Sequence, residues 1–261
     1  MLPEQRRQRI LEAIEGQGIG VISDLSANFD VSTMTIRRDL SILEEEGRIR
    51  RTRGGAIPAQ MIRVEPQYAS KQLINRQQKE LIASYAAQTF VENGDIIILE
   101  GGTTAVMMVP HLRRFRGLTV ITNGLYTAMA LQKLLPDLTV ICTGGILREV
   151  SLTFVGPIVQ NFFSEFHANK VFLSTTGLRL DSGFTDPSLM ETEAKKAMVK
   201  AADQIILMLD SSKIGVKSLV KVLNATEPNI LITDDGAPES ILNNLAETTE
   251  VRVVSISQQT Q

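Results

Sequence analysis

The chain has 261 residues, of which 43% are hydrophobic and 21% are charged, and its formal net charge is −2. This composition is typical of a globular protein with enough hydrophobic residues to form the cores of two domains. A net charge so close to zero gives no general sign of a polyanionic partner. The one cysteine, Cys142, lies in the apolar run LTVICTGG, which predicts a buried thiol in a reducing compartment and excludes an internal disulfide. The polar start MLPEQRRQRI is no signal peptide and no apolar run reaches the roughly 18 residues of a membrane span, so we expect a cytoplasmic protein with no membrane partner.

Three helices are predicted near the amino end. The first, PEQRRQRILEAIEGQG, gathers its apolar residues on one face and ends in glycines that suit a helix stop. The second, VISDLSANF, carries apolar residues at i, i+3 and i+7. The turn DVS follows, and Ser32 or Thr33 is the expected N-cap of the third helix.

The third helix carries an apolar stripe formed by Ile36, Leu40 and Leu43. At about 100° per residue, Arg38 lies about 200° from Ile36 and therefore faces away from the core. This outward face offers hydroxyls, a guanidinium and small apolar groups, which suit base edges and phosphates. A helix, a short turn and a helix with a basic outer face predict a helix-turn-helix domain that binds DNA.

The segment GRIRRTRGGA comes next and predicts a β-wing whose arginines reach the sugar-phosphate backbone. Residues 1–56 carry nine Lys or Arg and nine Asp or Glu, so any basic footprint must come from segregation of charge, and a charge-mixed surface helix is the alternative. The predicted DNA-binding residues are Ser32, Thr33, Met34, Thr35, Arg37, Arg38, Ser41, Arg48, Arg50, Arg51 and Arg53.

The stretch VSTMTIRRDLSILEEEGRIRRTRGGA strongly resembles the N-terminal signature of the DeoR family of bacterial transcriptional regulators. The family core T-[IV]-R-R-D-[LIVMF] is met by residues 35–40. Arg53 stands where many members carry histidine, and it adds positive charge. We expect Asp39 to be structural, in a salt bridge within the domain, rather than a reader of bases.

A linker is predicted over residues 57–75, which carry two prolines and no clean periodicity. From residue 76 to 261, apolar strand-like runs alternate with helical segments, which predicts a mostly parallel, Rossmann-like α/β domain. The expected strands are DIIILE, LTVIT, LTVICTG, KVFLSTTG, QIILMLD, NILITD and VRVVSIS, and the expected helices cover 78–92, 103–113, 124–135, 156–166 and 188–202.

Polar loops follow these strands, where an open α/β sheet builds its ligand site. In GGTT, the glycines let backbone N–H groups approach an anion, the threonines add donors, and the following helix start adds its dipole. A tight strand-to-helix turn would need glycine for steric reasons alone, which is the structural alternative. The predicted effector-binding residues are Gly101, Gly102, Thr103, Thr104, Asn123, Gly144, Gly145, Thr176, Gly177 and Lys213.

The DeoR resemblance extends over this half through GTT, TN, GG, SKIG and an E-x-x-x-K helix formed by Glu191 and Lys195. It implies an effector domain similar to ribose-5-phosphate isomerase that senses a phosphorylated sugar. Glu100 stands where the family usually has aspartate, which changes the reach of the carboxylate at the ligand. By spacing alone, we expect Glu191 and Lys195 to form an ordinary ion pair on the helix surface.

The predicted function is a sequence-specific transcriptional regulator, a repressor of a carbohydrate catabolic operon that a phosphorylated sugar releases from DNA. We expect a homo-oligomer, dimer or tetramer, because one short helix reads too few bases, and we expect no metal or other cofactor and no enzymatic activity. One alternative is a sugar-phosphate isomerase, for which Asp181, Asp186 and Glu191 supply carboxylates near one loop. Another is a structural DNA-binding protein with a ligand-free second domain. The sequence does not identify the sugar or the operator, and it does not decide whether the protein represses or activates transcription.

Overall fold

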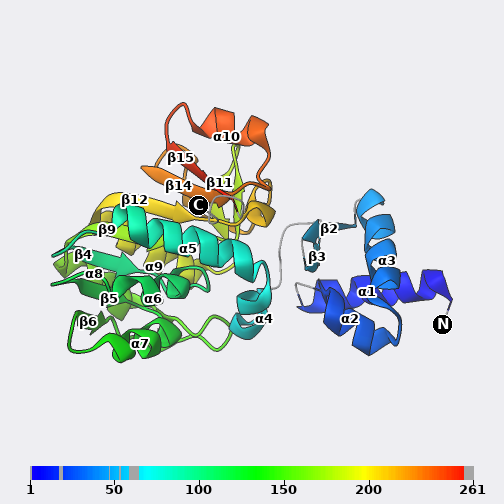
Figure 1. The fold of residues 1–261 in the computed structure, drawn as a ribbon, viewed down its shortest axis with the longest axis horizontal. Coiled ribbons are helices and arrows are strands. Elements are labelled where there is room, and N and C mark those ends of the chain that lie inside the picture. The colour runs from blue at the N-terminus through cyan, green and yellow to red at the C-terminus, as the bar shows by residue number, and fades with distance from the viewer. Residues whose placement is uncertain (1, 18–19, 47, 53, 59–64, 256–261) are drawn as a thin grey trace. The chain divides into compact units, whose positions relative to one another are not determined.

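The computed structural model describes residues 2–17, 20–46, 48–52, 54–58 and 65–255. The chain divides into two compact units, Met1–Asn75 and Arg76–Gln261, and each has its own hydrophobic core (Figure 1).

The N-terminal unit is a winged helix. Its elements are α1 (Pro3–Gln17), β1 (Gly20–Val21), α2 (Ile22–Phe29), α3 (Thr33–Glu45), β2 (Ile49–Thr52) and β3 (Gly55–Pro58). The three strands form an antiparallel sheet in the order β1-β3-β2. A Cβ atom at Gly55 would lie 1.9 Å from the Gly20 carbonyl oxygen, so the wing can meet β1 only with glycine there. The predicted helix-turn-helix and wing are confirmed.

The apolar faces predicted for the three helices close one core. It contains Ile10, Leu11, Ile14, Ile22, Leu25, Ile36, Leu40, Leu43, Ile49 and Ala56. Ser32 is the N-cap of α3, because its Oγ accepts a hydrogen bond from the Thr35 backbone N–H at 3.2 Å. One side of α3 therefore packs into the core, and the other side faces solvent.

The segment predicted as a linker is only partly irregular. Strand β3 continues to Pro58, and residues 68–73 form the short helix α4 (Tyr68–Leu73), whose Tyr68 is buried. Residues 59–64 lie outside the described residues.

The C-terminal unit is built on seven parallel strands in the order β15-β14-β12-β9-β4-β5-β6. They are β4 (Ile96–Leu99), β5 (Thr119–Thr122), β6 (Thr139–Cys142), β9 (Ala168–Leu173), β12 (Ala202–Met208), β14 (Ile230–Asp234) and β15 (Glu250–Val254). All seven predicted strands, and with them the parallel α/β fold, are confirmed. Cys142 is exposed rather than buried, because β6 is the edge strand and its outer residues lack a neighbour.

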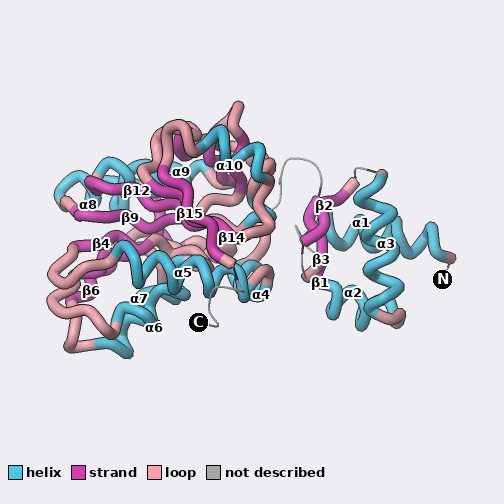
Figure 2. The backbone as a smooth tube through the Cα atoms, turned by 45° about the horizontal axis from the view of Figure 1, so that its top comes forward, coloured by secondary structure: helices cyan, strands magenta, loops and turns pink. Residues whose placement is uncertain are grey.

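Helices cover both faces of this sheet (Figure 2). One face is packed by α5 (Arg76–Phe90), α6 (Val109–Leu112) and α7 (Leu125–Leu131), and the other by α8 (Pro157–Glu165), α9 (Leu189–Lys200) and α10 (Glu239–Leu245). Alternate residues of each strand enter opposite cores: Ile97 and Leu99 lie in the first, and Ile98 in the second. A strand buried on both faces must be apolar throughout, which explains the continuous hydrophobic runs.

Among the described residues of this unit lie five further short strands, and the sequence patterns predicted none of them. They are β7 (Ile146–Leu147), β8 (Phe154–Val155), β10 (Gly177–Arg179), β11 (Gly183–Asp186) and β13 (Val220–Leu223). From β4 the chain continues to β5 and β6, and from β9 it continues the other way to β12, β14 and β15. The neighbouring strands β4 and β9 therefore mark the topological switch point, and sheets of this kind bind ligands beyond the carboxyl ends there.

Candidate DNA interface and sensor site

The outward face of α3 presents the residues predicted to contact DNA. Ser32, Thr33, Met34, Arg37 and Arg38 are exposed, while Thr35 and Ser41 are partly buried. Met34 has 73% of its surface exposed although it is apolar, which is unusual for a residue without a partner surface. The face therefore combines cations, hydroxyls and a small apolar group, which are the groups that contact base edges and phosphates.

Asp39 has the structural role expected of it. Its Oδ2 accepts from Arg6 Nε at 2.7 Å, its Oδ1 accepts from Arg6 Nη2 at 3.3 Å, and Arg7 Nη1 lies 3.9 Å away. The Asp39 side chain is only 4% exposed. The pair ties α1 to α3 through a buried carboxylate, whereas the neighbouring Arg37 and Arg38 are exposed.

The wing arginines differ in how they are placed. Arg48 is exposed and its Nη2 donates to Gln8 Oε1 at 3.1 Å, whereas Arg50 and Arg51 are partly buried. Arg51 Nη1 donates to Ser41 Oγ at 2.7 Å, and the Arg51 backbone N–H donates to Glu44 Oε1 at 2.7 Å. Arg51 therefore docks the wing on α3 in the DNA-free protein instead of extending outward.

Burial lowers the pKa of Arg50, an effect that Glu44 opposes. Glu44 thus acts on two of the wing arginines, by its charge at Arg50 and by a hydrogen bond from the backbone of Arg51. Arg53, also predicted to contact DNA, lies outside the described residues.

The GGTT loop follows β4 and packs against the loop that follows β5. Gly101 N–H donates to Asn123 Oδ1 at 3.0 Å, and Asn123 Nδ2 donates to the Phe154 carbonyl at 3.0 Å. A Cβ atom at Gly101 would lie 2.6 Å from Gly124 Cα, so the two backbones touch. Asn123 therefore positions the loop from within the fold.

The threonines of the loop are buried, Thr103 at 6% and Thr104 at 1% exposure. The helix predicted over 103–113 consists of a 3₁₀ turn, η1 (Ala105–Met108), followed by the four residues of α6. Its dipole is correspondingly small, so anion binding at this loop would depend on N–H groups and side chains more than on a helix end.

The remaining predicted effector residues divide between two places. Lys213 lies in η3 (Ser211–Lys213), and its Nζ donates to Ser174 Oγ at 2.7 Å, at the carboxyl end of β9. Thr176 N–H donates to Asp186 Oδ1 at 2.7 Å, while Gly177 is buried in β10. These residues lie beside the switch point.

Gly144 and Gly145 lie after β6, two strands from β4. Both have positive φ angles, 64° and 114°, and a Cβ atom at Gly145 would lie 2.9 Å from the Val155 carbonyl oxygen. They form the turn that leads into β7, and the conformation alone accounts for glycine at both positions.

Lys195 is the centre of a buried charge cluster that the sequence patterns did not predict. Its Nζ donates to Asp186 Oδ2 at 2.7 Å and to the Ser174 carbonyl at 2.6 Å, and lies 3.6 Å from Glu100 Oε1. The expected surface ion pair between Glu191 and Lys195 is therefore wrong: the residues are 7% and 6% exposed and pair with other partners. The reason is that α9 turns this face towards β8, β9 and β11 rather than solvent.

The cluster has marked effects on protonation. Burial lowers the pKa of Lys195, but Asp186, Glu100 and Glu191 outweigh burial, so the pKa lies above its ordinary value. Burial raises the pKa of Glu100, Lys195 opposes that shift, and Glu191 and Asp186 add to it. Glu100 Oε2 is buried without a hydrogen-bond partner. Lys195 and a backbone hydrogen bond from Gly102 only partly offset the burial of Glu100.

Arg148 and Thr153 join Glu191 at the edge of this cluster. Arg148 Nη1 lies 2.9 Å from Glu191 Oε1, and Thr153 Oγ1 donates to the same oxygen at 2.8 Å. Ser151 Oγ lies 3.3 Å from Arg148 Nη1 and 2.9 Å from Thr153 Oγ1. No sequence signal marked Arg148 or Thr153, because both reach the site through the short hairpin of β7 and β8.

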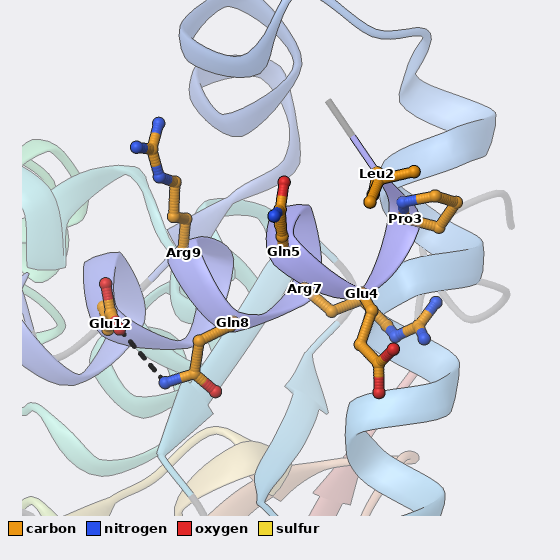
Figure 3. A pocket seen from close by; sticks show the side chains of 8 residues that line it. All are labelled: Leu2, Pro3, Glu4, Gln5, Arg7, Gln8, Arg9 and Glu12. Atoms are coloured by element: carbon orange, nitrogen blue, oxygen red, sulfur yellow. Dashed lines mark hydrogen bonds between the residues drawn. The ribbon is translucent and has the colours of Figure 1, made fainter.

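A pocket lies along α1 (Figure 3). It is lined by Leu2, Pro3, Glu4, Gln5, Arg7, Gln8, Arg9 and Glu12. Within the described part of the chain, these lining residues belong to one helix and the residue before it, and Gln8 Nε2 donates to Glu12 Oε1 at 3.0 Å. With no second element to enclose a ligand, we assign the pocket no binding role.

A winged helix with an outward arginine-bearing α3, and a separate parallel α/β unit with polar loops at its switch point, define a DNA-binding regulator with a sensor domain. Residues 6–60 match the DeoR-like helix-turn-helix domain, and residues 74–235 match the DeoR C terminal sensor domain. The chain belongs to the DeoR family of helix-turn-helix transcriptional regulators.

The relatives cover nearly the whole chain. The HTH-type transcriptional regulator GolR of Listeria innocua is 37% identical over 90% of this chain and 92% of its own length. The putative aga operon transcriptional repressor of Escherichia coli O157:H7 is 32% identical over 92% of this chain and 90% of its own length.

Among solved structures, ribose 5-phosphate isomerase from Plasmodium falciparum is similar with a TM-score of 0.38 and 14% identity, over 53% of this chain and 52% of that chain.

In the part of the chain that the structure describes, no helix combines the length and apolarity needed to cross a membrane.

Proposed function

We propose that the protein represses a carbohydrate catabolic operon by binding its operator, and that a phosphorylated sugar releases it from DNA. The observation that carries the DNA-binding part is the outward face of α3, where Arg37, Arg38 and the apolar Met34 are exposed together while Asp39 is locked to Arg6. Repression is supported by the name of the Escherichia coli relative, a putative repressor of the aga operon.

On DNA, α3 enters the major groove and the wing follows the phosphate backbone. Because Arg51 holds Ser41 and the wing backbone is tied to Glu44, the wing and the recognition helix approach the duplex as one rigid surface. One such helix reads few base pairs, so useful specificity requires two copies on a symmetric operator and hence a homo-oligomer.

In the sensor domain, a phosphorylated sugar would lie beyond β4 and β9. The GGTT loop offers backbone N–H groups, and Lys213 with Ser174 offers a cation and a hydroxyl for the sugar or its phosphate. Release requires that the ligand bind one oligomer geometry more tightly than the geometry that fits the operator.

The test is operator selection from random duplexes by the full chain, followed by competition with a panel of sugar phosphates. We expect one enriched sequence, and release from it by one phosphorylated sugar but not by its unphosphorylated form. The variant with Thr103→Ala and Thr104→Ala should bind the same operator and fail to respond. Retained response in that variant would remove the Thr103 and Thr104 hydroxyls from the site.

The competing function, a sugar-phosphate isomerase, is tested on the same panel by assaying turnover. An enzyme is favoured if the wild type turns over a sugar phosphate and the variant Asp186→Asn does not, because Asp186 holds Lys195 at the switch point. The third possibility, a structural DNA-binding protein, predicts that no sugar phosphate stabilises the chain, whereas a ligand at 100 times its Kd stabilises by about 2.7 kcal/mol.

A further inference from the structure

We propose that Arg148 is the anion-recognising residue of the sensor site, and that a phosphate monoester binds by taking the Arg148 guanidinium away from Glu191. The inference rests on the proposed function for the idea that the anion is part of a sugar phosphate, and it adds the residue that selects for the phosphate.

The first observation is how Arg148 and Thr153 share one acceptor. Arg148 Nη1 and Thr153 Oγ1 both point at Glu191 Oε1, at 2.9 and 2.8 Å. A cation and a hydroxyl that converge on a single oxygen can serve an oxygen of a bound phosphate in the same way. In the ligand-free protein, the Glu191 carboxylate occupies the position that such an anion would take.

The second observation is that these donors adjoin the GGTT loop. Arg148 follows β7 and Thr153 precedes β8, and the loop between them crosses the end of β5, where the Leu125 N–H donates to the Leu152 carbonyl at 3.0 Å. A Cβ atom at Gly101 would lie 2.6 Å from Thr153 Cγ2. The loop N–H groups, the Thr153 hydroxyl and the guanidinium therefore gather at one end of the sheet.

The third observation is the difference in exposure across the ion pair. The Arg148 side chain is 20% exposed and the Glu191 side chain is 8% exposed. The guanidinium is thus the member of the pair nearer to solvent, and an incoming anion meets it before it meets the carboxylate. When Arg148 moves to the phosphate, the Glu191 carboxylate still interacts with the charge of Lys195. This interaction limits the free energy lost when Glu191 gives up its ion pair with Arg148.

A planar guanidinium matches phosphate oxygens with two parallel hydrogen bonds, which a lysine cannot reproduce. Competition with Glu191 makes opposite predictions for the two members of the ion pair. Removing the cation should weaken phosphate binding, and removing the competing carboxylate should strengthen it. A pair that only supports the fold would respond in the same direction to both changes.

The experiment is isothermal titration calorimetry of the full chain, without DNA, with inorganic phosphate as the probe and acetate as a carboxylate comparison. The variants are Arg148→Gln, Arg148→Lys and Glu191→Gln. The matched control is Arg179→Gln, which breaks an exposed arginine–carboxylate pair with Asp181 at 2.7 Å. Circular dichroism verifies that each variant folds, and Glu191→Gln decides the matter if Arg148→Gln does not fold.

We expect Arg148→Gln to weaken phosphate binding by about tenfold or more, Arg148→Lys to weaken it less, and Glu191→Gln to strengthen it several-fold, with Arg179→Gln unchanged. The inference is overturned if Arg148→Gln binds phosphate as the wild type does, if Glu191→Gln weakens binding, or if the wild type binds no phosphate at all. A protein that binds phosphate through Arg148 but stays on DNA with every sugar phosphate would contradict the proposed function and leave this inference intact.

Discussion

Asp39 and Arg38 are neighbours in the chain, but we expect Asp39 to stabilise the fold and Arg38 to contact DNA. Substituting each residue in turn therefore distinguishes an effect on stability from an effect on DNA binding. In Asp39→Asn, the amide can present only one acceptor to Arg6, and its NH₂ group would face an arginine donor. The exchange therefore breaks the two-pronged pair of 2.7 and 3.3 Å and leaves Arg6 without its carboxylate.

The size of the effect follows from the burial of the pair. Hydrogen bonds to charged groups contribute about 1.5–3 kcal/mol each, but the Arg6 side chain is 13% exposed and can be partly rehydrated after the loss. We therefore expect about 2 kcal/mol of destabilisation in the N-terminal unit. That corresponds to roughly a 30-fold change in its unfolding equilibrium.

Hydrogen exchange of the full chain measures this change locally. Amides of α1 and α3 should lose protection by roughly 30-fold in Asp39→Asn, while amides of the C-terminal sheet keep theirs. Arg38→Ala is the control, because Arg38 is next to Asp39 in the chain but its side chain is exposed, so its loss should leave protection unchanged. Unaltered protection of α3 in Asp39→Asn would refute the structural role of the pair, and a loss in Arg38→Ala would refute the outward placement of Arg38.

Three further exchanges test the two sites. Arg38→Ala should weaken operator binding in fluorescence anisotropy by about 1–3 kcal/mol and reduce base discrimination, and equal affinity would remove Arg38 from the recognition surface. Arg51→Ala should weaken all duplexes about equally, because it removes the Arg51–Ser41 hydrogen bond that docks the wing on α3, and it should change the slope of log K against log salt little; a changed base preference would mean that the Arg51–Ser41 pair acts in reading sequence. Because burial raises the pKa of Glu100, the folded protein holds this proton more strongly than the unfolded chain, so its contribution to stability is fullest below the ordinary value of 4.5 and is lost as pH rises through the raised pKa. Glu100→Gln should therefore flatten the dependence of Tm on pH above 4.5, and superimposable profiles of wild type and variant would contradict a raised pKa of Glu100.

The sequence predicts the main strands and the recognition helix because each follows a local rule. A continuous β-branched run such as DIIILE needs cover on both faces, and a stripe such as Ile36, Leu40 and Leu43 needs one face buried. Neither rule depends on which segments become neighbours. The five short strands escaped prediction because two to four residues carry no periodicity, and their pairing is decided by the rest of the fold.

The charged residues show where local rules end. Glu191 and Lys195 have the same spacing on a surface helix as on a buried one, and only the packing of α9 against the sheet distinguishes the two cases. Cys142 lies in a run as apolar as its neighbours, and its exposure follows from the position of β6 at the sheet edge. Arg51 was predicted to extend towards DNA, but its side chain bonds Ser41, a direction that spacing along the chain does not encode.

The central claim is that α3 reads an operator and that a phosphorylated sugar at the sensor site ends that binding. Anisotropy of the full chain on its selected operator, titrated with each sugar phosphate in turn, tests both halves together. The account predicts tight, salt-sensitive binding that one phosphate ester reverses, and weaker binding by Arg38→Ala in the absence of any sugar phosphate. Binding indifferent to duplex sequence, or a complex that no phosphorylated sugar dissociates, would contradict it.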